Sequence, residues 1–260
     1  EAAFLWKNLL STWPYFNRRV WLGSAAVIAI AGGWLNTQPG WRDLLPPLAM
    51  GAAIFALYTL IVGPQFARQD IRSDLGHADI LKTYPLAGWQ IVLGELLTPA
   101  AILTGLLWLA LLTVVIALQP LADTHPWLEL PVRITAGLGL AALVPLLVTL
   151  QLVIPNAAAL LFPAWFQASR TRGGGPEVMG QRMIFFFAQV VTMVIALSPA
   201  LALGGLLAVT LHVFIGPVVA VLAAVGVMGT VLALEVAAAL WLLGRRFEEL
   251  DLSADLHPSG

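Results

Sequence analysis

Residues 91–118, IVLGELLTPAAILTGLLWLALLTVVIAL, contain a single charged side chain, Glu95. About 20 apolar residues in a row are enough for a helix to cross a bilayer. Five more apolar runs share this character, at about residues 20–36, 44–63, 131–153, 183–199 and 217–243. The chain is therefore predicted to be an all-α, polytopic integral membrane protein with six transmembrane helices in one domain, residues 1–260.

The composition leads to the same class. The 260 residues are 60% hydrophobic and only 10% charged, whereas a soluble domain carries about 25% charged residues. Cysteine is absent, which excludes disulfides, thiolate metal sites and cysteine catalysis. The four histidines are scattered, and no phosphate-binding loop or nucleophile motif occurs. We therefore predict no catalytic residue, no metal ligand and no nucleic-acid partner.

The basic residues between the runs are distributed unequally. One side of the predicted topology carries Lys7, Arg18, Arg19, Arg68, Arg72, Lys82, Arg170, Arg172, Arg182, Arg245 and Arg246. The other side carries only Arg42 and Arg133. Because cytoplasmic loops are enriched in Lys and Arg, the richer side is predicted to face the cytoplasm. An even number of spans then places both ends of the chain there.

The fourth run continues to about residue 162 and is too long for one simple crossing. Pro145 and Pro155 each lack the N–H that a helix interior needs, so a kink or break is expected. We predict a span over 131–153, followed by a separate short segment over 154–166 at the membrane interface.

Residues 199–217 are apolar, without a charge, and contain Gly204, Gly205 and Gly216. Backbone at membrane depth must satisfy its own polar groups. Re-entrant helices entering from the outer face would do so. In the alternative, the fifth and sixth spans are long helices joined near His212.

Two segments outside the runs are predicted to be helical. Residues 2–10, AAFLWKNLL, are amphipathic and suit a helix lying in the inner interface, or else the start of the first span. Residues 65–83 place apolar side chains every three or four positions, with basic and acidic flanks. Such a helix suits a protein partner, the alternative being an ordinary solvated helix. Its predicted contact residues are Arg68, Asp70, Ile71, Arg72, Asp74, Leu75, Asp79, Leu81 and Lys82.

Two carboxyl side chains lie inside apolar runs. Glu235 is ten residues before Arg245, which places it about 15 Å along a helix from that charge. An intramembrane carboxyl is costly and marks either a transport path or a hydrogen-bonded structural contact. Glu95 lies about one turn inside its span and suits a structural role better.

The pattern resembles the permease subunits of bacterial ABC exporters, in the six-span class with an amphipathic N-terminal helix. Four pieces carry the resemblance, which covers nearly the whole chain. They are LWKNLL (5–10), RQDIRSDLGHADILKTYPLAGWQIVLGELL (68–97), NAAALLFPAWF with PEVMGQRM (156–166 and 176–183), and LGRRFEELDLSAD (243–255).

The resemblance implies a function for the 65–83 helix, which would be the coupling helix gripped by a separate P-loop ATPase subunit. ATP and Mg²⁺ would then belong to that partner, and this chain would be a transport subunit and not an enzyme. Six spans make half of such a transporter, so a second permease copy or a homologous half is expected. The expected location is the bacterial inner membrane.

Two other functions stay open at this stage. A proton-coupled secondary transporter would use Glu235 as its proton site, and a membrane scaffold would transport nothing. The low charge content suits lipids, hydrophobic drugs or lipophilic peptides better than ions as cargo.

Overall fold

A computed structural model describes residues 18–66, 72, 81–83, 85–125, 128–162 and 176–250. These residues form helices and their connections, with no strand in the described ranges. The helices are α2 (Arg18–Thr37), α3 (Pro39–Arg42), α4 (Leu45–Phe66), α7 (Gly88–Ala117), α8 (Gln119–Ala122), α9 (Leu130–Leu161), α11 (Pro176–Phe214) and α12 (Pro217–Glu249). Six of them are long and apolar enough to cross a membrane, which confirms the predicted all-α class and the six long apolar helices.

The outer surface of the bundle is apolar. Large side chains such as Leu22, Ile30 and Phe214 are 70%, 72% and 78% exposed. A soluble protein rarely exposes contiguous apolar surface on this scale. Lipid is the solvent that such a surface suits, and the fold is that of a multi-pass membrane protein.

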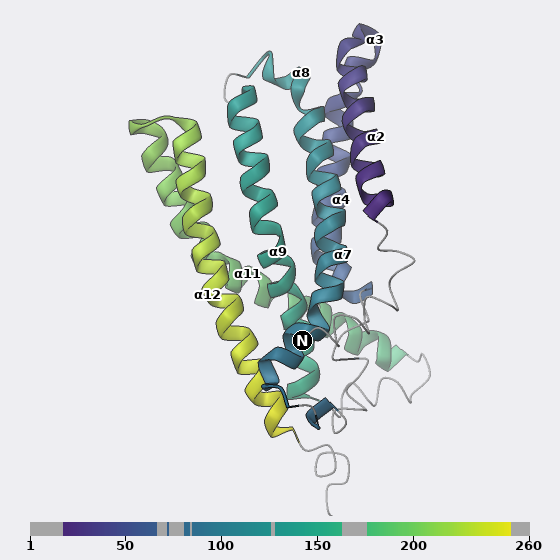
Figure 1. The fold of residues 1–260 in the computed structure, drawn as a ribbon, viewed down its shortest axis with the longest axis vertical. Coiled ribbons are helices and arrows are strands. Elements are labelled where there is room, and N and C mark those ends of the chain that lie inside the picture. Colours follow the sequence, from purple (N-terminus) through teal and green to yellow (C-terminus); the bar gives the residue numbers. More distant parts are fainter. Residues whose placement is uncertain are drawn as a thin grey trace, which may run out of the picture.

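Helices α7 and α9 form the middle of the bundle. Helices α2 and α4 pack on one side of α7, and α12 packs against both α7 and α9 with α11 beside it (Figure 1). The core is formed by side chains such as Val92, Leu96, Leu152 and Leu232, all fully buried. In Figure 1 the start of α7 and the ends of α9 and α12 lie at the lower end.

Polar contacts join the helices at the upper end, where α3 and α8 lie (Figure 1). Arg42 of α3 forms an ion pair with Asp123, which follows α8. The guanidinium of Arg133, only 6% exposed in the first turn of α9, donates to the side-chain oxygen of Gln119. The ion pair joins the connection of α2 to α4 with that of α7 to α9, and the Arg133 bond joins α8 to the start of α9.

The break predicted after residue 153 is wrong, because α9 continues through Pro145 and Pro155 to Leu161. A proline at 145 leaves the carbonyl oxygen of Ala141 without its helical partner. Trp108 on α7 supplies a replacement, since its Nε1 donates to that oxygen at 2.9 Å. The neighbouring helix α7 therefore lets α9 tolerate Pro145. Only part of the predicted 154–166 segment is described, and that part belongs to α9.

The re-entrant helices predicted over 199–217 are not confirmed. Instead α11 is one helix from Pro176 to Phe214, joined to α12 by a turn at Ile215 and Gly216, as in the alternative of long spans. Pro199 leaves the Ile195 carbonyl without a helical donor, and the Ser198 hydroxyl donates to it at 2.7 Å. Gly216 has a φ of 105°, which favours glycine and allows the reversal.

Candidate functional site

Of the predicted coupling residues, the structure describes Arg72, Leu81 and Lys82. Arg68, Asp70, Ile71, Asp74, Leu75 and Asp79 lie outside the described residues, as does the predicted interfacial helix over 2–10. Arg72 Nη2 donates to the carbonyl oxygen of Pro64 at 2.7 Å. Pro64 lies in the last turn of α4, so this bond ties the 65–83 segment back onto the helix that precedes it.

The far end of the segment contacts α12. Leu81 is 6% exposed and belongs to the same apolar cluster as Phe247 and Leu250. Lys82 Nζ lies 5.9 Å from the centre of the Phe247 ring and donates to the carbonyl oxygen of Leu250. A cation over an aromatic face adds electrostatic attraction to the apolar contact. The segment is therefore attached to a helix more than 160 residues further along the chain.

Helices α7 and α12 then touch backbone to backbone. A Cβ atom added at Gly88 would overlap the carbonyl oxygen of Gly244, and one added at Gly244 would lie 2.7 Å from the Cα of Trp89. The Gly88 N–H, at the start of α7, donates to Glu248 Oε1 at 2.6 Å. A carboxylate is favourable there because the free N–H groups of a helix N-terminus carry partial positive charge.

The two predicted intramembrane carboxyls lie in different places. Glu95 is 1% exposed within the α7 core. Glu235 is half-buried on α12, and its Oε2 is enclosed without a hydrogen-bond partner in the described part of the chain. Seven residues earlier, on the same face of α12, Met228 lies against Gly204 of α11. Glu235 follows Met228 by two helical turns and therefore lies on the side of α12 that faces α11.

A second polar feature escaped the sequence analysis. Gln151 of α9 and Gln189 of α11 meet at the carbonyl oxygen of Ile61, and Gln65 of α4 bonds to Gln189; we call these three residues the glutamine cluster. Gln65 Nε2 donates to Gln189 Oε1 at 2.6 Å. Longer bonds of 3.3 and 3.5 Å run from Gln151 and Gln189 to the Ile61 oxygen. Gln151 is 2% exposed, and its Oε1 has no partner among the described residues.

A scan for charged residues cannot find this cluster, because amides are neutral. A signal was nevertheless present, since Gln151 and Gln189 interrupt apolar runs. A polar side chain inside the membrane is expected to hydrogen-bond across helices. Which helices it joins depends on the packing of the bundle.

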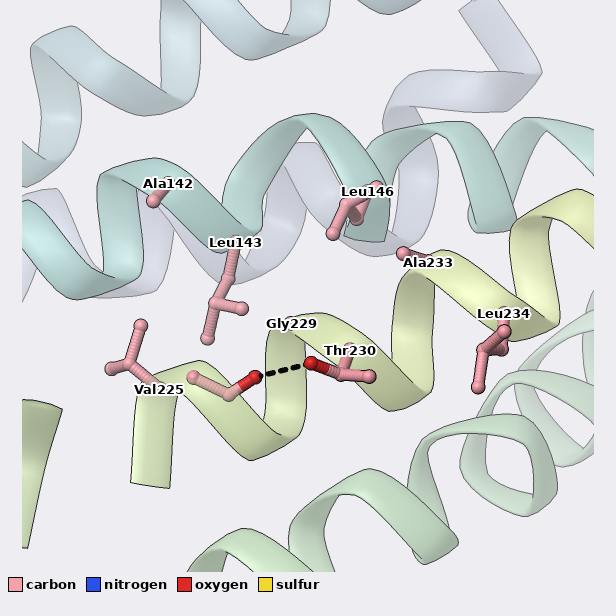
Figure 2. Close-up of a pocket in the computed structure, with 9 residues that line it drawn as sticks. Ala142, Leu143, Leu146, Val225, Gly229, Thr230, Ala233 and Leu234 are labelled. Atoms are coloured by element: carbon pink, nitrogen blue, oxygen red, sulfur yellow. Dashed lines mark hydrogen bonds between the residues drawn. The ribbon is translucent and has the colours of Figure 1, made fainter. Parts of the chain in front are cut away.

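An apolar groove lies between α9 and α12 at mid-height. Its volume is about 510 Å³, and its walls are formed by Ala142, Leu143, Leu146, Val225, Gly226, Gly229, Thr230, Ala233 and Leu234. Figure 2 shows the Thr230 hydroxyl bonded to its own helix, at the carbonyl oxygen of Gly226, 2.9 Å away. The groove is thus lined almost wholly by small and branched apolar side chains.

Across the described ranges, no group of three or more His, Asp or Glu side chains could hold a metal ion. In the described ranges, the polar features below the upper end include the two contacts of the 65–83 segment, the glutamine cluster and the two carboxyls. None of the protein-family models, curated proteins or solved structures compared with this chain matches it.

Proposed function

We propose that this chain is the transmembrane subunit of an ATP-driven exporter, moved by a separate P-loop ATPase. The supporting observation is the attachment of the 65–83 segment at both of its described ends. Arg72 bonds to the end of α4, and Leu81 and Lys82 pack onto the end of α12. A segment fixed to two helices can pass a force applied from outside the membrane into the bundle.

The proposal places the lower end of the bundle in the cytoplasm. The lower end carries the basic residues Lys82, Arg245 and Arg246, whereas the upper end carries Arg42 and Arg133. That distribution follows the enrichment of Lys and Arg in cytoplasmic loops. The membrane is then the bacterial inner membrane, with both ends of the chain on the ATPase side.

Two partners complete the proposed transporter. The ATPase subunit binds ATP and Mg²⁺, because this sequence has no phosphate-binding loop of its own. A second permease copy, or a homologous half, supplies the other side of the transport path. The glutamine cluster and Glu235 are the intramembrane polar groups proposed to line or support that path.

The test is the ATPase activity of a purified complex. The proposal predicts a P-loop ATPase gene beside the gene for this chain; the two proteins are co-expressed, and hydrolysis is compared with that of the ATPase alone. We expect the permease to change the rate and Asp74→Lys to abolish the change. Asp43→Lys, the same charge reversal at the upper end, should leave it intact. Equal effects of the two variants would contradict the proposal, as would an ATPase that ignores the chain.

One observation favours a second candidate, a proton-coupled transporter. The enclosed Oε2 of Glu235 lacks a partner in the described part of the chain. A carboxyl in such a place could take up and release a proton during a transport cycle. This candidate requires pH-driven flux in vesicles that contain the chain without any ATPase, and the loss of that flux in Glu235→Gln.

A further inference from the structure

Two stretches of chain that are far apart in sequence contact each other at the lower end of the bundle. Residues 81–88 close the cytoplasmic segment and start α7, and residues 243–250 end α12. An apolar contact, a cation over an aromatic ring and a hydrogen bond to a carboxylate join them. We call this contact the α12 latch and define it by Leu81, Lys82, Gly88, Gly244 and Glu248.

The latch brings the backbones of α7 and α12 into contact. At Gly88 and Gly244 the two backbones are in direct contact, and neither position has space for a Cβ atom. The hydrogen bond from the Gly88 N–H to Glu248 lies beside this backbone contact and joins the same two helices. Close-packed interfaces of this kind transmit displacement and do not absorb it. The start of α7 and the end of α12 should therefore move as one body.

Movement of α12 has consequences further up the bundle. Helix α12 packs against α7, α9 and α11, and its middle forms one wall of the groove shown in Figure 2. The other wall belongs to α9, which is held to α7 by the bond from Trp108 to Ala141. A change in the tilt of α12 relative to α9 would widen or narrow this groove.

We propose that the α12 latch transmits displacement of the cytoplasmic segment to α12 and thereby changes the groove between α9 and α12. This inference rests on the proposed function for the source of the displacement. Within it, Glu248 and Lys82 are positioning residues that keep the segment on α12. The covalent connection reaches α7 alone, and the latch adds direct contacts with the end of α12.

The first test measures the latch in the chain without any partner. Glu248→Ala removes the acceptor of the Gly88 N–H, Glu248→Gln keeps an oxygen there, and Glu249→Ala changes the exposed neighbouring carboxylate. Hydrogen exchange of residues 81–88, measured in nanodiscs by mass spectrometry, should become about tenfold faster in Glu248→Ala. We expect Glu248→Gln to restore part of the protection and Glu249→Ala to match the natural chain. Equal exchange in Glu248→Ala and Glu249→Ala would overturn the latch.

The second test measures transmission in the complex with its ATPase. The chain lacks cysteine, so Ala233→Cys places a single thiol in the groove, and its alkylation rate is measured with and without ATP. We expect ATP to change the rate, Glu248→Ala to abolish that change and Glu249→Ala to preserve it.

The outcomes of the second test separate two failures. An ATP effect that survives Glu248→Ala would overturn the transmission proposal, and so would the absence of any ATP effect in a complex that hydrolyses ATP. If no complex hydrolyses ATP, the proposed function fails, and the exchange experiment still decides whether the latch exists.

Discussion

Replacing Gly244 by alanine tests the close contact between α7 and α12. The new methyl group would lie 2.7 Å from the Cα and 2.8 Å from the Cβ of Trp89. These atoms belong to or directly adjoin the backbone of α7, so no rotamer change relieves the overlap and the helices must separate. Forcing an extra carbon into a packed interface costs about 1–3 kcal/mol.

A matched control exists on the same helix. Gly226 has no atom within 4 Å of an added Cβ. Gly226→Ala should therefore show only the higher helix propensity of alanine, a gain of about 0.5–1 kcal/mol. The same gain applies to Gly244→Ala and offsets part of its cost. Because both variants share that gain, the difference between them should equal the overlap itself, about 1–3 kcal/mol.

The assay is unfolding of the purified chain in detergent by titration with SDS. We expect the midpoint of Gly244→Ala to fall below that of the natural chain, and that of Gly226→Ala to equal or exceed it. Hydrogen exchange of residues 81–88 should rise in Gly244→Ala alone. A Gly244→Ala chain as stable as Gly226→Ala would refute the close contact and, with it, the rigid joint between α7 and α12.

Three further predictions concern groups within the bundle. Trp108→Phe removes the donor to Ala141, so SDS unfolding should show that the chain loses about 0.6–1.7 kcal/mol of stability. A change within error would contradict the account of how α9 tolerates Pro145. Gln189→Leu breaks the glutamine cluster, and we expect a similar loss by the same assay together with altered ATP-driven transport. Glu235→Gln should leave ATP-dependent hydrolysis in the complex intact, whereas a pH-driven flux without any ATPase that this variant abolishes would favour the proton-coupled alternative.

Features of the chain that depend on local sequence were predicted well. The apolar run over 91–118 is α7, Gly88–Ala117, because the length and apolarity of a segment suffice to define a membrane helix. The continuation of α9 through Pro145 without a break depends on a non-local contact. A proline does remove a helical bond, but Trp108, which precedes Ala141 by 33 residues, supplies the missing donor. Only the packed bundle brings that donor to α9.

In the candidate site too, the residues were predicted from local sequence, whereas their contacts were not. The sequence pattern drew attention to Leu81 and Lys82 because they continue a helical stripe next to charged flanks. It could not show that Lys82 contacts Phe247 and Leu250, since nothing local relates segments so far apart. The bond between Gln65 and Gln189 spans 124 residues and was missed for the same reason.

The most direct test of the central claim is the composition of the complex isolated from native membranes. The tagged chain is purified in mild detergent, and the recovered proteins are quantified by mass spectrometry. The account predicts a P-loop ATPase in equal molar amount, lost in Asp74→Lys and retained in Asp43→Lys. Recovery of the chain with no ATPase, or with an ATPase that Asp74→Lys fails to release, would contradict it.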